Sequence, residues 1–316
     1  MSYFDLSEKR VSVPALAAAS ALLLVLTRVF SGSGLTVRQG FILTVVCEAA
    51  VFVIPAVVFS FLTLRRLEEK PSFSEIIKET GFRGFAPSRI RLIVYATILL
   101  ISGAAILKFV IFRYAYDVSA YSLYGASVST ADPGLSDVLL LTLTFAALPA
   151  AVEEYFFRGV VYNGLKEYSR PVGIAVSAIL FALLHFEASL LPVYIFAGAV
   201  LGWTFSLTGS LFPSMAVHFV FNIYTLFFEK YLWLVSSSSE SEALFIFIMT
   251  SVFLLALFMF LGDGIRAVRA LEKSGELDRN EFPSAATSLT ELFKCLISPS
   301  FIVCILIFLF GVLALR

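Results

Sequence analysis

The sequence predicts an all-α membrane protein, a polytopic helix bundle of about eight or nine transmembrane helices that forms one membrane domain over residues 1–316. Hydrophobic residues make up 59% of the chain and charged residues only 15%, and the mean hydropathy is +0.93. A soluble domain of this size is far less apolar. The apolar residues also gather into runs near the length of roughly 20 residues that a helix needs to cross the hydrocarbon layer.

Apolar runs that meet this length, or come close to it, recur along the whole chain. The predicted spans cover residues 11–30, 41–64, 91–112, 136–157, 171–190, 192–208, 211–233, 243–262 and 299–315. The first lacks a small-residue cleavage site, so we expect a retained anchor rather than a signal peptide. The last is short and follows polar residues 263–298, which we interpret as a cytoplasmic or interfacial segment.

The distribution of basic residues predicts the orientation. With the N-terminus in the cytoplasm, the inner segments contain 17 Lys and Arg residues and the outer segments five, while Lys108 lies inside a span. Basic residues concentrate on the cytoplasmic side of membrane proteins. We therefore expect a multi-pass integral membrane protein with a cytoplasmic N-terminus, located in the cell membrane if the source is prokaryotic. Because 23 basic residues balance 23 acidic ones, net charge suggests no nucleic acid partner, and the expected partner is membrane lipid.

A few ionisable or amide side chains lie within the predicted spans, where such groups are costly and usually mark a site. They are Glu153, Glu154 and Arg158 in "EEYFFR", His185 in "FALLH", and His218 and Asn222 in "HFVFN". Both histidines of the chain belong to this set. A carboxylate with an imidazole can deprotonate a water, and a second imidazole with a carboxamide can stabilise an oxyanion. The set is sufficient for peptide hydrolysis but is not unique to it.

Helix geometry separates the two glutamates. Glu154 and Arg158 are four residues apart and share a face, so a bracing ion pair is the first expectation for them. Glu153 points about 100° away, without that partner, which suits a carboxylate used for proton transfer. His218 and Asn222 also share a face.

Structural readings of these polar residues stand beside the functional ones. A lone buried histidine is often only a hydrogen-bonded core residue, and an asparagine often only joins neighbouring helices. Glu48, in the second span, could be functional or could bond a neighbouring helix, and no motif includes it.

The three stretches "EEYFFR", "FALLH" and "HFVFN" together resemble the EExxxR, FxxxH and HxxxN motifs of the CPBP family. This family, also called the ABI family, includes the type II CAAX prenyl endopeptidases and bacteriocin-processing enzymes. The resemblance covers about residues 135–230, the predicted catalytic core, and three motifs in order are more specific than one. It implies an intramembrane glutamic peptidase, a hydrolase that cleaves a membrane-associated peptide or protein, including a lipidated, prenylated CAAX-type substrate.

The resemblance also implies a role for each motif residue. Glu153 and His185 would activate the water, and His218 and Asn222 would stabilise the oxyanion. Glu154 and Arg158 would support them. The predicted span limits place Glu153 and His218 in the inner half of the membrane but His185 nearer the middle or the outer half.

Other readings of the same residues remain open. Glu153, His185 and His218 could be zinc ligands, since these residue types suit zinc and leave a position for water. The HExxH arrangement is absent, so we expect a metal-free site without a cofactor. From another class, a proton-coupled transporter could use these residues as a relay, although no internal repeat is evident. A non-enzymatic scaffold is a further alternative.

Overall fold

The computed structural model describes residues 6–30, 37–64, 79–115, 134–166, 169–236, 242–275, 277 and 281–314. Within these ranges every regular element is a helix, as the sequence predicts. Six helical stretches there are long and apolar enough to cross a membrane: Phe41–Phe61, Pro87–Phe112, Leu135–Leu165, Ala188–Thr208, Leu211–Leu234 and Glu242–Ser274. The protein is therefore an all-helical integral membrane protein.

The other three predicted spans are shorter in the structure. Helix α1 (Leu6–Phe30) contributes the apolar stretch Ser12–Thr27, and α9 (Arg170–Leu183) has 14 residues. Helix α15 (Pro299–Ala314) has 16 residues and is bent by 62° from α14 (Ala285–Leu296), so the pair counts at most as one broken span. The predicted total of eight or nine spans is not confirmed.

Three of the long helical stretches contain π-helical turns between their α-helical parts. In chain order they are α2 (Val37–Glu48), π Ala49–Val53 and α3 (Ile54–Leu64); α6 (Leu135–Thr142), π Leu143–Ala147, α7 (Leu148–Glu154), π Tyr155–Tyr162 and α8 (Asn163–Leu165); and α11 (Leu211–Ile223), π Tyr224–Phe228 and α12 (Glu229–Ser236). Such turns frequently occur at functional sites. The longest of them, Tyr155–Tyr162, begins directly after Glu153 and Glu154.

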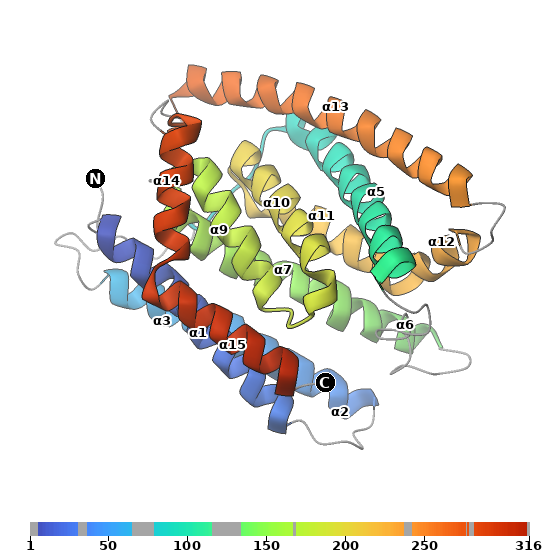
Figure 1. The fold of residues 1–316 in the computed structure, drawn as a ribbon, viewed down its shortest axis with the longest axis horizontal. Coiled ribbons are helices and arrows are strands. Elements are labelled where there is room, and N and C mark those ends of the chain that lie inside the picture. The colour runs from blue at the N-terminus through green and yellow to red at the C-terminus, as the bar shows by residue number, and fades with distance from the viewer. Residues whose placement is uncertain are drawn as a thin grey trace.

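Helices α7, α9, α10 (Leu191–Thr208) and α11 lie in the middle of the molecule (Figure 1). Helices α5 (Ile90–Ala115) and α13 (Glu242–Ser274) lie along one side of them, and α1, α2, α3 and α15 along the other (Figure 1). The motif residues come from α7, from the π-helical segment Tyr155–Tyr162 that continues it, from α11 and from the turn that follows α9. The outer helices therefore surround the part of the chain that carries the candidate site.

A pair of glycines lets α9 and α10 approach closely. A Cβ atom on Gly198 would lie 2.7 Å from Cα of Ala178, and one on Gly202 would lie 3.2 Å from a side-chain carbon of Ile174. Two small residues four positions apart commonly allow such backbone contact between membrane helices. The contact fixes α10 against the helix that precedes His185.

Helix α9 ends at Leu183, seven residues before the predicted limit of its span at residue 190. The chain then turns through Phe186, whose φ of 54° is uncommon for a bulky residue and unfavourable for its Cβ. The Phe186 ring lies where a side chain on Gly311 of α15 would stand, with a carbon 2.3 Å from the position of the missing Cβ. The turn at Phe186 thus packs against α15, a helix far along the chain, and the local hydropathy pattern does not indicate it.

Residues 281–296 pack on one end of the central helices. Glu281 pairs with Arg170 at the start of α9, and the ring of Phe282 stacks on Trp203 of α10 at 6.4 Å between centroids. Helix α13 runs unbroken to Ser274, so the polar segment predicted over residues 263–298 begins as part of that helix. Its cytoplasmic location stays a prediction.

Candidate active site

The ion pair expected from the helical spacing is present and lies deep in the protein. Nη1 of Arg158 is 2.7 Å from Oε1 of Glu154, and both side chains have 0% exposure. Nη2 of Arg158 donates to the carbonyl oxygen of Gly198 on α10 at 2.9 Å. The guanidinium also lies over the ring of Phe181, 5.1 Å from its centroid. Two of its three nitrogens are hydrogen-bonded, whereas Nε is buried without a hydrogen-bond partner. The bond to Gly198 joins the Leu135–Leu165 helix to α10.

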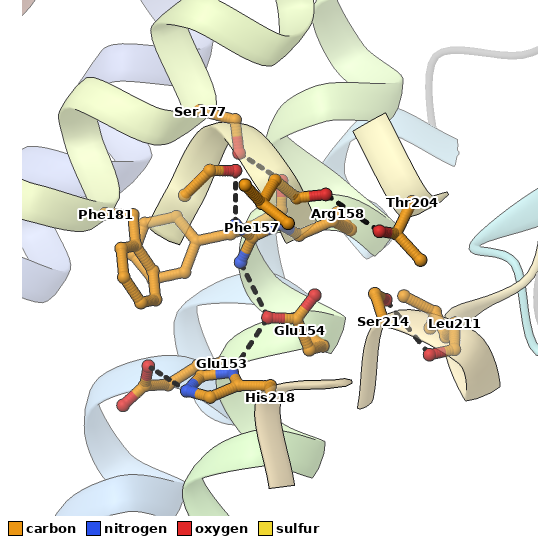
Figure 2. A network of polar contacts seen from close by, with 12 residues as sticks. Glu153, Glu154, Phe157, Arg158, Ser177, Phe181, Thr204, Leu211, Ser214 and His218 are labelled. Carbon is orange, nitrogen blue, oxygen red and sulfur yellow. Dashed lines mark hydrogen bonds and ion pairs between the residues drawn. The ribbon is translucent and has the colours of Figure 1, made fainter. Parts of the chain in front are cut away.

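His218 lies between two carboxylates (Figure 2). Its Nδ1 is 2.9 Å from Oε1 of Glu154, and its Nε2 is 4.0 Å from Oε2 of Glu153. Oε1 of Glu154 thus accepts two hydrogen bonds, one from Arg158 and one from Nδ1–H of His218. The hydrogen bond from His218 orients its ring and leaves Nε2 directed at Glu153.

Glu153 therefore differs from Glu154 in its partners, although the two are adjacent in sequence. Both side chains are buried, and Arg158 is committed to Glu154. The imidazole of His218 lies 4.0 Å from the Glu153 carboxylate, between Nε2 and Oε2. The separation expected from the turn of the helix is thus present, and Glu153 is the carboxylate that faces the ring without a bonded arginine.

Asn222 lies one helical turn beyond His218 on α11. Its Nδ2 donates to the carbonyl oxygen of Ala146 at 3.4 Å, and Ala146 belongs to the π-helical segment Leu143–Ala147. A π-helical turn departs from the regular backbone hydrogen-bond pattern, which allows a carbonyl to accept from a side chain. The observed contact is the interhelical one that amides commonly make.

His185 lies in the turn after α9, next to an aromatic stack. Its Nδ1 is 2.7 Å from the carbonyl oxygen of Phe181, and its ring stacks on Tyr194 at 3.9 Å between centroids. The ring of Phe181 contacts both imidazoles, with its centroid 4.6 Å from that of His185 and 5.8 Å from that of His218. The turn after the short α9 therefore places His185 in the same region of the protein as His218.

An apolar hollow of about 330 Å³ lies beside these residues, between α7 and α11. Its lining residues are Ala147, Ala150, Ala151, Met215, Ala216 and Phe219. Ala150 is one turn before Glu153, and Phe219 directly follows His218. A hollow with this apolar lining suits a hydrophobic chain lying between the two helices that carry Glu153 and His218, although neither side chain lines it.

The possible zinc ligands do not form a metal site in the part of the chain that the structure describes. No group of three or more His, Cys, Asp and Glu residues there is arranged to hold a metal ion. Glu153, His185 and His218 are thus not a preformed zinc site among the described residues.

Sequence reasoning missed two neighbours of the site, Tyr194 and the carbonyl of Gly198, and left Glu48 unassigned. Tyr194 stacks on His185, and no pattern in its apolar run indicates this. The carbonyl of Gly198 accepts from Arg158, and the Gly198 and Gly202 spacing was the available signal for the close helix contact. Glu48, which no motif includes, interacts electrostatically with Glu153.

The family model described as Type II CAAX prenyl endopeptidase Rce1-like matches residues 135–224. All six motif residues lie within this segment, and the match confirms the family resemblance that the three motifs predict. Searches of curated proteins and of solved structures gave no match. The matched segment is similar to a CAAX-type protease of the membrane, and it is the same segment that brings Glu153, Glu154, Arg158 and His218 together.

Proposed function

We propose that this protein is an intramembrane endopeptidase that hydrolyses a peptide bond of a membrane-associated substrate. In this proposal Glu153 is the general base that deprotonates the attacking water. The observation that carries the proposal is the position of His218, held by Glu154 on one side and facing Glu153 on the other. This arrangement lies within the segment similar to CAAX prenyl endopeptidases. A carboxylate and an oriented imidazole next to an apolar hollow suit water-dependent cleavage in a membrane.

Each charged or titratable residue of the site has a separate role in the proposed mechanism. Arg158 pairs with Glu154, and Glu154 accepts a hydrogen bond from Nδ1–H of His218. Nε2 of His218 is left facing Glu153, where the proposed mechanism needs a proton on Nε2 that can be donated to the developing oxyanion. The arginine lowers the cost of burying the Glu154 carboxylate.

In the proposed reaction a water lies between Glu153 and the substrate carbonyl carbon. Glu153 takes a proton from the water as its oxygen attacks, and the carbonyl oxygen becomes an oxyanion. Nε2–H of His218 donates to that oxyanion, and the amide of Asn222, one turn away, is the second donor. Glu153 then returns its proton to the leaving amine, so no group is consumed.

We assign His185 to the same water. Its ring contacts Phe181, as that of His218 does, and it lies in a turn held by the stacking of Tyr194. A second imidazole in this region can orient the water that Glu153 deprotonates. The assignment predicts that His185→Ala lowers kcat while the melting temperature stays close to that of the wild type.

The hollow and the family match support a proposal for the substrate class. The apolar lining between α7 and α11 suits an aliphatic or prenyl chain placed next to the scissile bond. A prenylated CAAX-type peptide is the first candidate, because the matched family model describes a prenyl endopeptidase. With a cytoplasmic N-terminus, this site would lie in the inner half of the membrane, where such a tail is available.

Cleavage of a peptide panel by detergent-purified protein tests the proposal. The panel contains farnesylated and unlipidated CAAX peptides and generic membrane peptides, and the proteins are the wild type, Glu153→Gln and Glu272→Gln. The control Glu272 is an exposed carboxylate on α13. Loss of a general base lowers the rate by about 10²- to 10⁴-fold. We expect that loss for Glu153→Gln alone, at an unchanged melting temperature and without an effect of chelator on the wild type.

Each other outcome points to a specific alternative. Full activity of Glu153→Gln would overturn the mechanism. Loss of wild-type activity with chelator, restored by zinc, would favour the metalloprotease. Glu153-dependent proton uptake into proteoliposomes without any cleavage would favour the transporter.

A further inference from the structure

Glu48 lies at the end of α2, on a helix that runs alongside the Leu135–Leu165 helix in the same direction. Helix α2 packs against α7, and the following helix α3 packs against the π-helical segment Tyr155–Tyr162. About one turn after Glu48, the ring of Phe52 meets the ring of Phe157 at 6.0 Å. Phe157 is itself one turn after Glu153. Because the two helices are parallel, the turn that carries Glu48 meets the turn that carries Glu153.

Burial and charge agree with this placement. Oε2 of Glu48 and Oε2 of Glu153 are both buried, and the charges of the two carboxylates interact. The other charged groups around Glu153 are Glu154 and Arg158 on its own helix and His218 on α11. Among the described residues, Glu48 is thus the acidic side chain that α2 adds to the charged residues around Glu153.

The approach of Glu48 to Glu153 limits the charge that the two side chains can carry together. Two carboxylates close together in a low-dielectric space do not both stay ionised, and one of them holds a proton. A proton held by the pair can form a hydrogen bond from one carboxyl group to the other.

We propose that Glu48 is a positioning residue of this site, whose carboxyl group is joined to the carboxyl group of Glu153 by a hydrogen bond, directly or through one water. This bond would hold Glu153 in the orientation in which it meets the reacting water. The positioning role rests on the proposed function of Glu153 as general base. The pairing of Glu48 with Glu153 does not depend on that function.

Two nearly isosteric replacements test the hydrogen bond. Gln at position 48 keeps an N–H donor at the end of a side chain of the same length, whereas Met has a similar size and no donor. A hydrogen bond to a charged group is worth about a 10- to 100-fold change in rate. We expect Glu48→Met to lower kcat by this factor with KM unchanged and Glu48→Gln to stay within about threefold of the wild type. Cys47→Ala, one residue earlier on the same helix, is the control for local packing and should leave kcat unchanged.

Unchanged kcat in Glu48→Met would overturn the positioning role. Equal loss of kcat in the Gln and Met variants, with equally lowered melting temperatures, would overturn it too, because packing alone would then explain both.

A double-mutant cycle on thermal stability separates this inference from the proposed function. It uses Glu48→Met, Glu153→Gln and the double variant, and it needs no substrate. Interacting residues give non-additive shifts, whereas distant ones add. Non-additive shifts in a protein that cleaves no peptide would uphold the pairing and overturn the function. Additive shifts would overturn the pairing whatever the activity.

Discussion

Two buried ion pairs in this protein look alike and have different surroundings. Glu154 and Arg158 belong to one helix and are completely buried, with 2.7 Å between Oε1 and Nη1. Lys108 of α5 and Glu229 of α12 join two helices, with 2.6 Å between Nζ and Oε1 and with about a tenth of each side chain exposed. The first pair also bonds His218, which faces a second carboxylate.

The surroundings of the second pair are apolar or aromatic instead. The side chains lining the space beside it include Ala105, Leu232, Trp233 and Phe245. Trp233 and Phe245 both pack on Phe109 of α5. A buried ion pair by itself is therefore weak evidence for catalysis. The imidazole and the additional carboxylate beside Glu154 make the difference, and this comparison leads to three predictions.

The largest expected effect comes from breaking the first pair at Arg158. Removing one partner of a buried pair leaves an uncompensated charge and costs about 3–5 kcal/mol. Arg158→Met should lower the free energy of unfolding by this amount, and kcat should fall because Glu154 no longer holds the ring of His218. Unfolding in detergent and single-substrate kinetics measure the two effects. A stable and fully active Arg158→Met protein would contradict the role assigned to the pair.

A smaller effect is expected where Arg158 bonds the backbone of α10. A Cβ atom on Gly198 would lie 2.7 Å from Cα of Ala178, so Gly198→Ala must push α9 and α10 apart. Overpacking of this kind costs about 1–3 kcal/mol. Gly262→Ala on α13, where nothing lies within 4 Å of the added carbon, is the matched control and should be neutral or slightly stabilising. Equal melting temperatures of the two variants would contradict the close packing.

The smallest effect is expected when the second pair is replaced as a whole. Apolar replacement of both members of a buried pair is often neutral or stabilising. Lys108→Met combined with Glu229→Leu should therefore change stability by less than about 1 kcal/mol and leave kcat unchanged. The corresponding double replacement of Glu154 and Arg158 should abolish cleavage even if the protein stays folded. Loss of activity in the Lys108 and Glu229 variant would remove the distinction between the two pairs.

Hydropathy and helical spacing predict the parts of this fold that depend on local sequence. Six of the expected spans are present, and the four-residue spacing of Glu154 and Arg158 gives their ion pair. The end of α9 could not be found in this way, because the turn at Phe186 packs on Gly311, far along the chain. The apolar residues that follow Leu183 look like a continuation of the helix.

In the candidate site, too, some features can be predicted from the local sequence and others depend on long-range packing. The motif residues could be selected because ionisable groups are rare in apolar runs. The bond between His218 and Glu154 joins residues 64 positions apart, and no periodicity predicts it. Glu48 could not be assigned, since its proximity to Glu153 depends on the packing of Phe52 against Phe157. Long-range packing thus determines which polar residues meet.

The most direct test of the account compares the same substitution at two buried carboxylates. Glu153→Gln and Glu229→Gln are purified together, and the melting temperature and the cleavage rate are measured for each. We expect Glu153→Gln to keep its melting temperature and lose cleavage by about 10²-fold or more, as a general base requires. We expect Glu229→Gln to melt earlier, because Lys108 loses its partner, and to keep the kcat of the folded protein. Wild-type cleavage by Glu153→Gln would contradict the assignment of Glu153 as the catalytic base.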